Sequence, residues 1–582
     1  MPDEDIGQKG AFSNWLTKLL LKQRRISMDK KTLLAFALSF LVLFGWSFFF
    51  GPKQDQKSHQ EKPPVVTSTE KAAPPPEKTT TPPVPSPALA KEMEGQETAP
   101  IPEKEVRVET PLYVAVFSNV GPTIKSFKLK KYRETVDKDS PPIEMVNLRR
   151  GMGDFLRFSF AGGAEKNALP LAYESDRSTI QIRPGSAPQL LRFRSLTADR
   201  LLITQVYRFY PDQYRIDLQV QVENHSQAPI ERSFQTILNA LPPEGKKSYY
   251  SYIGLMALSD GKLKKLKIKK KSKEKLVTGN IGWFAYENGY FMSAVVPETP
   301  ANARFTGHML PSGALHGIFQ TPPIKVAPSE KVTSSYFLYM GPHELEILKH
   351  FGKNLDKAVN FGWTDIIARP LLYLLRFCHK YVHNYGIAII LLTIIIKILF
   401  WPLTHKSYKS MKEMQKLQPR LAKLREKYKG NKEQMNKEMM ALYKTYKVNP
   451  MGGCLPMIIQ IPVFFALYRI LGDSIELRHA PFMLWINDLS APDRLFHFAF
   501  KIPFMSPPYG IPVLTLLMGA SMFIQQKMTP TPGDPSQAKF MMFLPIIFTV
   551  MFINFPSGLV LYWLVNNILS IGQQYRIHRG SA

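Results

Sequence analysis

Long apolar runs constrain this 582-residue chain more than any other feature of its sequence. Five runs are present, at residues 32–50, 385–402, 451–471, 511–528 and 540–571. A helix needs roughly 20 apolar residues to cross the hydrocarbon core of a bilayer. The last run is too long for one crossing and is interrupted by NFPSG, so we divide it into helices at 539–554 and 559–574. The sequence therefore predicts a polytopic α-helical membrane protein with six transmembrane helices.

Lysine and arginine residues predict how these helices are oriented, because short cytoplasmic segments carry an excess of both. Basic residues precede the first run, which predicts a cytoplasmic N-terminus at 1–31. The loop 403–450 is crowded with lysine and arginine and is also predicted to be cytoplasmic. The two assignments agree if each run crosses once. They put segment 473–510 outside, and the loop 529–538 and the tail 575–582 inside.

The first run has a rival interpretation as a cleavable signal peptide. That interpretation is weaker, because Trp and Phe fill the end of the run and no small-x-small cleavage site follows. MDKKTLLAF, from Met28, has the form of a chain start, which leaves open whether residues 1–27 belong to the native protein.

Two segments outside the membrane follow the first run. Residues 51–105 are rich in Pro, Thr, Lys and Glu, a composition typical of an extended, disordered linker. Residues 106–345 alternate apolar and polar positions, as in LLITQVYRFY, which predicts a large β-sandwich domain. Its basic run at 262–275 is either a solvated loop or hairpin edge, or a contact with anionic lipid head groups.

Two amphipathic segments flank the second predicted transmembrane helix. Residues 363–383 interleave aromatic and charged side chains, which is typical of a helix lying in the membrane interface. In the loop 403–450, apolar residues recur at spacings of three and four on both sides of Gly430. This pattern predicts a basic helical hairpin. The hairpin is either solvated and without a partner, or a contact surface for polypeptide, RNA or lipid.

Composition narrows the function classes. A formal net charge of +29 favours anionic partners, such as lipid head groups, nucleic acid or acidic polypeptide. Two cysteines form neither a disulfide framework nor a metal-binding spacing. The sequence lacks the common hydrolase, zinc-protease and nucleotide-binding motifs. We therefore predict no enzymatic activity, no cofactor and no bound metal.

Lys397 is a lone cation inside the second run, TIIIKILFWPLT. A lysine near the bilayer centre costs roughly 3 kcal/mol on insertion scales, so it should face a polar cavity or a partner. Alternatively, its side chain reaches the cytoplasmic interface, roughly 10 Å away by helical rise. Thr393 lies on the same helical face, and Gln460, Asn566 and Asn567 are polar positions in other runs. Together they could line a water-filled groove whose counter-charge comes from a substrate.

Several stretches resemble the YidC-type membrane protein insertases. They are PLTHKSYKSMKEMQKLQP, EMMALYKTYKVNPMGGCLPMIIQIPVFFALY, ELRHAPFMLWINDLS and FPSGLVLYWLVNN. GWFAYENGYF resembles the periplasmic domain of the same family, in its Gram-negative form. The resemblance implies five core helices around a hydrophilic groove that is open to the cytoplasm and to lipid. A positive residue in that groove attracts the polar or acidic tail of a nascent protein.

The resemblance also assigns residues. Lys397 matches the positive position, where most bacterial members carry arginine. Thr393, Tyr562 and Trp563 match substrate-contacting positions, and Trp563 replaces what is often tyrosine. A lysine supplies a point charge in place of the planar fork of arginine.

The implied function is an insertase and chaperone for nascent inner-membrane proteins, acting alone or with the Sec translocon. The basic hairpin would approach the ribosome or the signal-recognition receptor, lipids would be further partners, and no specific DNA binding is expected. One rival is a small-solute transporter, disfavoured because no repeated halves are visible. Another is a membrane anchor that displays a carbohydrate-binding β domain.

Overall fold

The computed structural model describes residues 103–149, 152–161, 171–243, 252–269, 273–446, 448, 455–529 and 535–579. The predicted first transmembrane helix at 32–50 lies outside the described residues, as does the linker up to residue 102.

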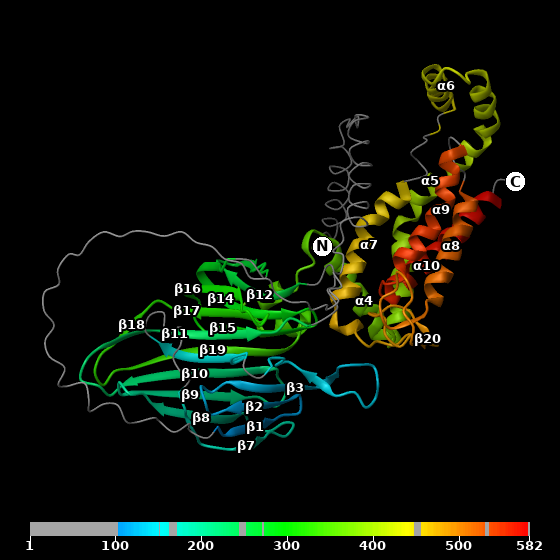
Figure 1. The fold of residues 1–582 in the computed structure, drawn as a ribbon. Helices are drawn as coiled ribbons and strands as arrows, with labels where there is room; N and C mark the ends of the chain where they lie inside the picture. The colour runs from blue at the N-terminus through cyan, green and yellow to red at the C-terminus, as the bar shows by residue number, and fades with distance from the viewer. Residues whose placement is uncertain are drawn as a thin grey trace, which may run out of the picture. The chain divides into compact units, whose positions relative to one another are not determined.

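Two β-sheets account for the N-terminal part of the described chain (Figure 1). The smaller has the order β4 (Pro142–Glu144), β3 (Ile124–Arg133), β2 (Tyr113–Ser118), β1 (Glu105–Glu109) and β7 (Thr179–Gln181). The larger has the order β18 (Ile324–Val326), β11 (Ile230–Ala240), β17 (Leu315–Gln320), β16 (Ala301–Met309), β14 (Lys275–Asn288), β15 (Phe291–Pro297), β19 (Lys331–Pro342), β10 (Arg215–Asn224), β9 (Leu201–Phe209), β8 (Gln189–Leu196) and β6 (Glu174–Ser175). Off this path, β12 (Ile253–Ser259) pairs with β13 (Lys262–Lys265) and β14, and β5 (Leu156–Ala161) pairs with β11. The predicted β-rich region is confirmed.

Alternation of buried and accessible residues explains these strands. Along β10, every second side chain, from Ile216 to Val222, is buried. The two sheets pack through aromatic rings, since Phe117 of β2 contacts Tyr207 and Phe209 of β9. Edge-to-face packing of this kind adds to the stabilisation from apolar burial. Part of the predicted basic run is strand, because Lys262–Lys265 form β13.

The C-terminal part is helical. Its α-helices are α3 (Leu345–Phe351), α4 (Asp365–Val382), α5 (Tyr385–Lys427), α6 (Lys432–Thr445), α7 (Leu455–Asp473), α8 (Val513–Met528), α9 (Pro535–Phe552) and α10 (Ser557–Arg579). A short hairpin, β20 (Leu495–Phe498) and β21 (Tyr509–Ile511), lies between α7 and α8. Within the described residues, α5 is the one helix long and apolar enough to cross a membrane by length and composition, and Met541–Phe552 is a shorter apolar helix.

Helix α5 continues without a break from the predicted second transmembrane helix into the predicted basic hairpin. Asn384 caps its start by accepting a hydrogen bond from Ile387 N. The helix then runs for 43 residues through Pro402 and Pro419, or about 60 Å. The sequence analysis separated the two segments at Pro402. A proline removes one backbone donor, and here the remaining turns on both sides hold the helix together.

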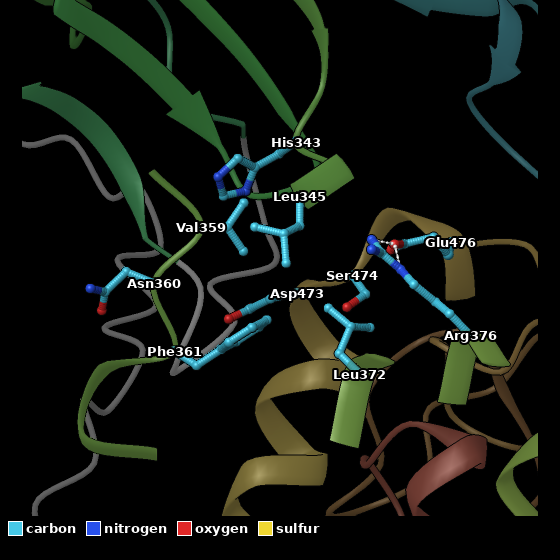
Figure 2. A pocket seen from close by; sticks show the side chains of 10 residues that line it. All are labelled: His343, Leu345, Val359, Asn360, Phe361, Leu372, Arg376, Asp473, Ser474 and Glu476. Carbon is cyan, nitrogen blue, oxygen red and sulfur yellow. Dashed lines mark hydrogen bonds and ion pairs between the residues drawn. The ribbon is translucent and has the colours of Figure 1, made fainter. Parts of the chain in front are cut away.

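A cluster of charged side chains joins α3, which follows the last strand of the β region, to α4 and to the segment after α7. Arg376 of α4 donates hydrogen bonds to Glu476, after α7, and to Glu346 of α3, and both acceptors are carboxylates. Figure 2 shows Arg376 and Glu476 beside a small cavity of about 20 Å³, which is room for one water molecule. His343 also lines this cavity, and its Nδ1 lies 3.3 Å from Glu287 Oε1 of β14.

The titration of the buried Glu287 carboxyl group should make the free energy of unfolding depend on pH. Burial raises the pKa of Glu287 to about 8 and lowers the pKa of His343 to about 4. Between its ordinary value and 8, Glu287 binds more protons in the folded state, so its contribution to stability declines as pH rises. His343 has the opposite effect below its ordinary pKa of 6.5, because its contribution to the free energy of unfolding grows as pH rises there. Stability should therefore decline from about pH 6.5 to 8.

Glu287→Gln is expected to remove this decline, because the amide keeps the shape of a protonated carboxyl and does not titrate. Thermal unfolding of the purified protein at pH 6, 7 and 8 measures it. The melting temperature of the variant should rise relative to wild type with each step in pH. Parallel curves would show that Glu287 does not titrate in this range.

Candidate functional site: a buried polar layer between α5, α8 and α10

The side chain of Lys397 points from α5 into the helical bundle. Only 9% of the residue is exposed, and its Nζ donates a hydrogen bond of 2.6 Å to Ser570 Oγ of α10. The Ser570 hydroxyl in turn donates to the carbonyl oxygen of Asn566. The next two residues of α5, Ile398 and Leu399, are exposed. The ammonium is therefore directed at α10 and away from the apolar outer face.

No carboxylate lies within 4.0 Å of Lys397 Nζ among the described residues. The helices that surround it offer hydroxyl and amide groups. A buried cation with neutral partners keeps a strong field, because the surrounding medium screens charge weakly. Such a site attracts a negative or polar group that enters the bundle.

Further polar side chains extend the layer along α10. Asn567 donates to Ser521 Oγ of α8 at 2.9 Å, and Gln573 donates to Thr404 Oγ1 of α5 at 3.0 Å. All four residues are buried. We name this set, together with Lys397 and Ser570, the polar layer. It joins three helices that otherwise pack through apolar side chains.

One side-chain amide atom on α8 and one on α10 have no hydrogen-bond partner among the residues that the structure describes. They are the Nε2 of Gln526 on α8 and the Oε1 of Gln574 on α10, both fully enclosed. A buried polar atom without a partner costs roughly 1–3 kcal/mol. Water or a polar polypeptide segment would satisfy both amides.

The other predicted residues form a second group. Gln460 of α7 donates to the Tyr562 hydroxyl of α10 at 3.0 Å. Trp563 packs edge-on against Phe464 of α7 and Phe552 of α9. Thus Gln460, Tyr562 and Trp563 come together, separately from Lys397 and Asn566.

Thr393 joins neither group by a hydrogen bond. It is buried one turn before Lys397, and its hydroxyl donates to the carbonyl oxygen of Ile389 in its own helix.

Four residues of the polar layer were not predicted from the sequence: Ser570, Ser521, Thr404 and Gln573. A usable signal was present in α10, where polar residues recur three and four positions apart in an apolar helix. Asn566, Ser570 and Gln573 follow that spacing, which puts them on one face. Ser521 carried no such signal because it is a single hydroxyl in an apolar stretch, and Thr404 carried none because it is one of several polar residues at the start of the basic loop.

Comparison with known proteins identifies the family. The model of the 60Kd inner membrane protein matches residues 377–582, and that of the YidC periplasmic domain matches residues 105–374. The membrane protein insertase YidC of Syntrophus aciditrophicus (strain SB) is 42% identical over 562 residues, covering 95% of this chain and 100% of that protein. This chain belongs to the YidC family. The YidC of Syntrophobacter fumaroxidans (strain DSM 10017 / MPOB) is 44% identical over 563 residues, with the same coverage.

The predicted resemblance to YidC-type insertases is therefore confirmed over nearly the whole chain. A crystal structure described as an active YidC insertase with its first transmembrane domain resolved is 18% identical. It matches 82% of this chain and 93% of its own, with a TM-score of 0.35. As a member of the YidC family, the chain is an inner membrane protein with a periplasmic domain.

Proposed function

We propose that this YidC family member inserts nascent proteins into the inner membrane and assists their folding, without enzymatic chemistry. The observation that carries the proposal is Lys397, a cation buried among hydroxyl and amide groups with no carboxylate beside it in the described chain. The polar layer would receive the hydrophilic tail of a substrate in a groove open to the cytoplasm. Tyr562 and Trp563 would contact its apolar segment.

Two free-energy contributions decide whether a substrate is inserted. A polar tail crosses hydrocarbon at a high desolvation cost, which polar side chains and water part-way across the bilayer lower. The apolar segment then moves into lipid, favoured by roughly 25 cal/mol per Å² of buried apolar surface. No nucleotide is needed for either step. The membrane potential assists acidic tails by about 2.3 kcal/mol per charge per 100 mV.

The proposed topology has six crossings, with residues 32–50 as the first and α5, α7, α8, α9 and α10 as the others. Both termini would then be cytoplasmic. Three contacts support the proposal that successive helices cross the membrane in alternating directions. Each contact is a hydrogen bond between the start of a helix and the segment that links α7 to α8. Asn384, before α5, donates to the carbonyl oxygen of Phe482, and Leu514 N of α8 donates to Asp493. Ser557 N, at the start of α10, donates to the carbonyl oxygen of Ala491.

Proposed partners are nascent membrane proteins, the Sec translocon, the ribosome or signal-recognition receptor, and membrane lipids. Exposed apolar side chains on α4, among them Ile366, Phe377 and Tyr381, support its place in the membrane interface. The basic hairpin of α5 and α6 supports contact with an anionic partner. Its small core buries Leu417 and Leu421 against Tyr443, which leaves its charged face accessible.

Reconstitution in liposomes tests the proposed function. We expect wild-type protein to insert a small single-spanning substrate into liposomes without nucleotide, above the level in empty liposomes. Protease protection of the translocated tail measures insertion. Deletion of residues 106–340 should leave most of the activity. The rival hypothesis, a membrane anchor that displays a carbohydrate-binding β domain, predicts instead that this deletion abolishes function. Absence of insertion by the wild-type protein would overturn the proposed function.

A further inference from the structure

The segment between α7 and α8 exposes aromatic side chains. Residues 495–511 read LFHFAFKIPFMSPPYGI, in which Lys501 is the one fully charged side chain and no acidic residue occurs. Phe496, Phe500 and Phe504 are 67%, 65% and 75% exposed. Phenylalanine side chains this accessible are unfavourable in water, because each leaves a large apolar area unburied. We call these three residues the aromatic rim.

The backbone that carries the aromatic rim is fixed to the helices. Arg494 is buried, and its guanidinium donates hydrogen bonds of 2.9 Å to the carbonyl oxygens of Pro508 and Ile553. Asn554, in the turn between α9 and α10, donates to the carbonyl oxygen of Phe504 and accepts from the backbone of Ser506. The exposure of the rim is therefore built into the fold and does not depend on a loosely held loop.

The position of the rim follows from the same contacts. Ile553 and Asn554 directly follow α9, and Asp493 beside Arg494 accepts a hydrogen bond from Leu514 in the first turn of α8. The rim thus lies level with the ends of α8 and α9, at the end of the bundle opposite α6 (Figure 1). Leu516 and Leu517 of α8, and Val550 of α9, are exposed apolar residues immediately beyond it.

We propose that the aromatic rim is a lipid-binding surface that lies in the membrane interface of the leaflet at this end of the bundle. Aromatic side chains are enriched at the boundary between head groups and hydrocarbon. Lys501 beside them would meet anionic head groups, and no carboxylate in residues 495–511 opposes that contact. The periplasmic end of the bundle would then have a second interfacial contact besides α4.

The proposal rests on the membrane crossing of α8 and α9, and it is independent of insertion activity. Spin labels at single cysteines test it in full-length protein reconstituted in vesicles of phosphatidylethanolamine and phosphatidylglycerol. The native cysteines are first removed by Cys378→Ser and Cys454→Ser. Labels are then placed by Phe500→Cys or Phe504→Cys. Collision with oxygen reports lipid, and collision with a water-soluble nickel complex reports water.

Two matched positions calibrate the result. Leu516→Cys labels the apolar face of α8, and Leu196→Cys labels an exposed residue of the β region. The oxygen-to-nickel ratio at Phe500 and Phe504 should exceed that at Leu196 several-fold and approach that at Leu516. Ratios like that of Leu196 would overturn the aromatic rim as a lipid surface. A lipid-like ratio at Leu516 in the same experiment would show that the crossing of α8 survives that result.

Discussion

Lys397→Ala is expected to reduce insertion of a substrate with an acidic N-terminal tail by about tenfold or more. At 4 Å and an effective dielectric constant of 20, the attraction between two unit charges is about 4 kcal/mol. Retaining even a third of this value changes an equilibrium about tenfold. The same substrate with a neutral tail should lose much less, because the lost interaction is between charges. The liposome assay with both substrates measures the difference.

Three control variants sharpen this experiment. Lys397→Arg keeps the charge and should keep most of the activity. Lys397→Met keeps the length and apolar stem, and should fail like the alanine variant. Lys406→Ala removes an exposed cation from the same helix and should insert both substrates normally. Equal insertion of the acidic substrate by Lys397→Ala and wild type would remove the charge mechanism.

The stability of the same variants separates this role from a structural one. A buried cation without a carboxylate partner is costly, so replacing it with methionine should not lower the melting temperature. A loss of insertion with unchanged or raised stability therefore assigns Lys397 to substrate reception. A parallel loss of both would mean that the hydrogen bond to Ser570 holds α5 against α10.

Gly519→Leu is expected to prevent normal packing of the helical bundle. Gly519 is buried in α8, and a Cβ atom built there would collide with the side chain of Thr549 on α9. Overpacking a core typically costs about 1–3 kcal/mol, and the four added carbon atoms of leucine would force the two helices apart. We expect a lower melting temperature in detergent and a smaller yield of folded protein.

Gly572 provides a matched control for Gly519. It lies in α10, is exposed, and has nothing within 4 Å of a Cβ built on it. Gly572→Ala should be neutral or stabilising, because alanine favours a helix over glycine by about 1 kcal/mol. Gly519→Ala should destabilise despite the same gain in helix propensity. Equal melting temperatures for the two alanine variants would show that α8 and α9 do not pack closely at Gly519.

Periodicity in the sequence predicts the elements whose own residues carry the signal. The β-rich region was predictable because Ile216, Leu218, Val220 and Val222 alternate with polar residues along one strand. Lys397 stood out because an isolated charge in an apolar run is expensive. These features need no knowledge of which segments are neighbours.

Features that depend on contacts between distant segments were not predictable in this way. Ser570 lies 173 residues after Lys397, and no local pattern pairs them. Residue Arg494 fixes its loop through carbonyl groups, which any residue type supplies. The continuity of α5 through Pro402 was missed for a different reason. A proline signals a helix end in most sequences, and here the turns on both sides compensate for the lost donor.

The unbroken length of α5 has a mechanical consequence. In the proposed topology, a partner bound where α5 meets α6 would act on the same continuous helix that carries Lys397, so its binding would also bias the orientation of the ammonium. Docking at the tip and capture of a tail are then reciprocal, since each alters the free energy of the other by the same amount. If the proposed ribosome contact is made at that end of α5, it would influence how Lys397 meets the substrate tail.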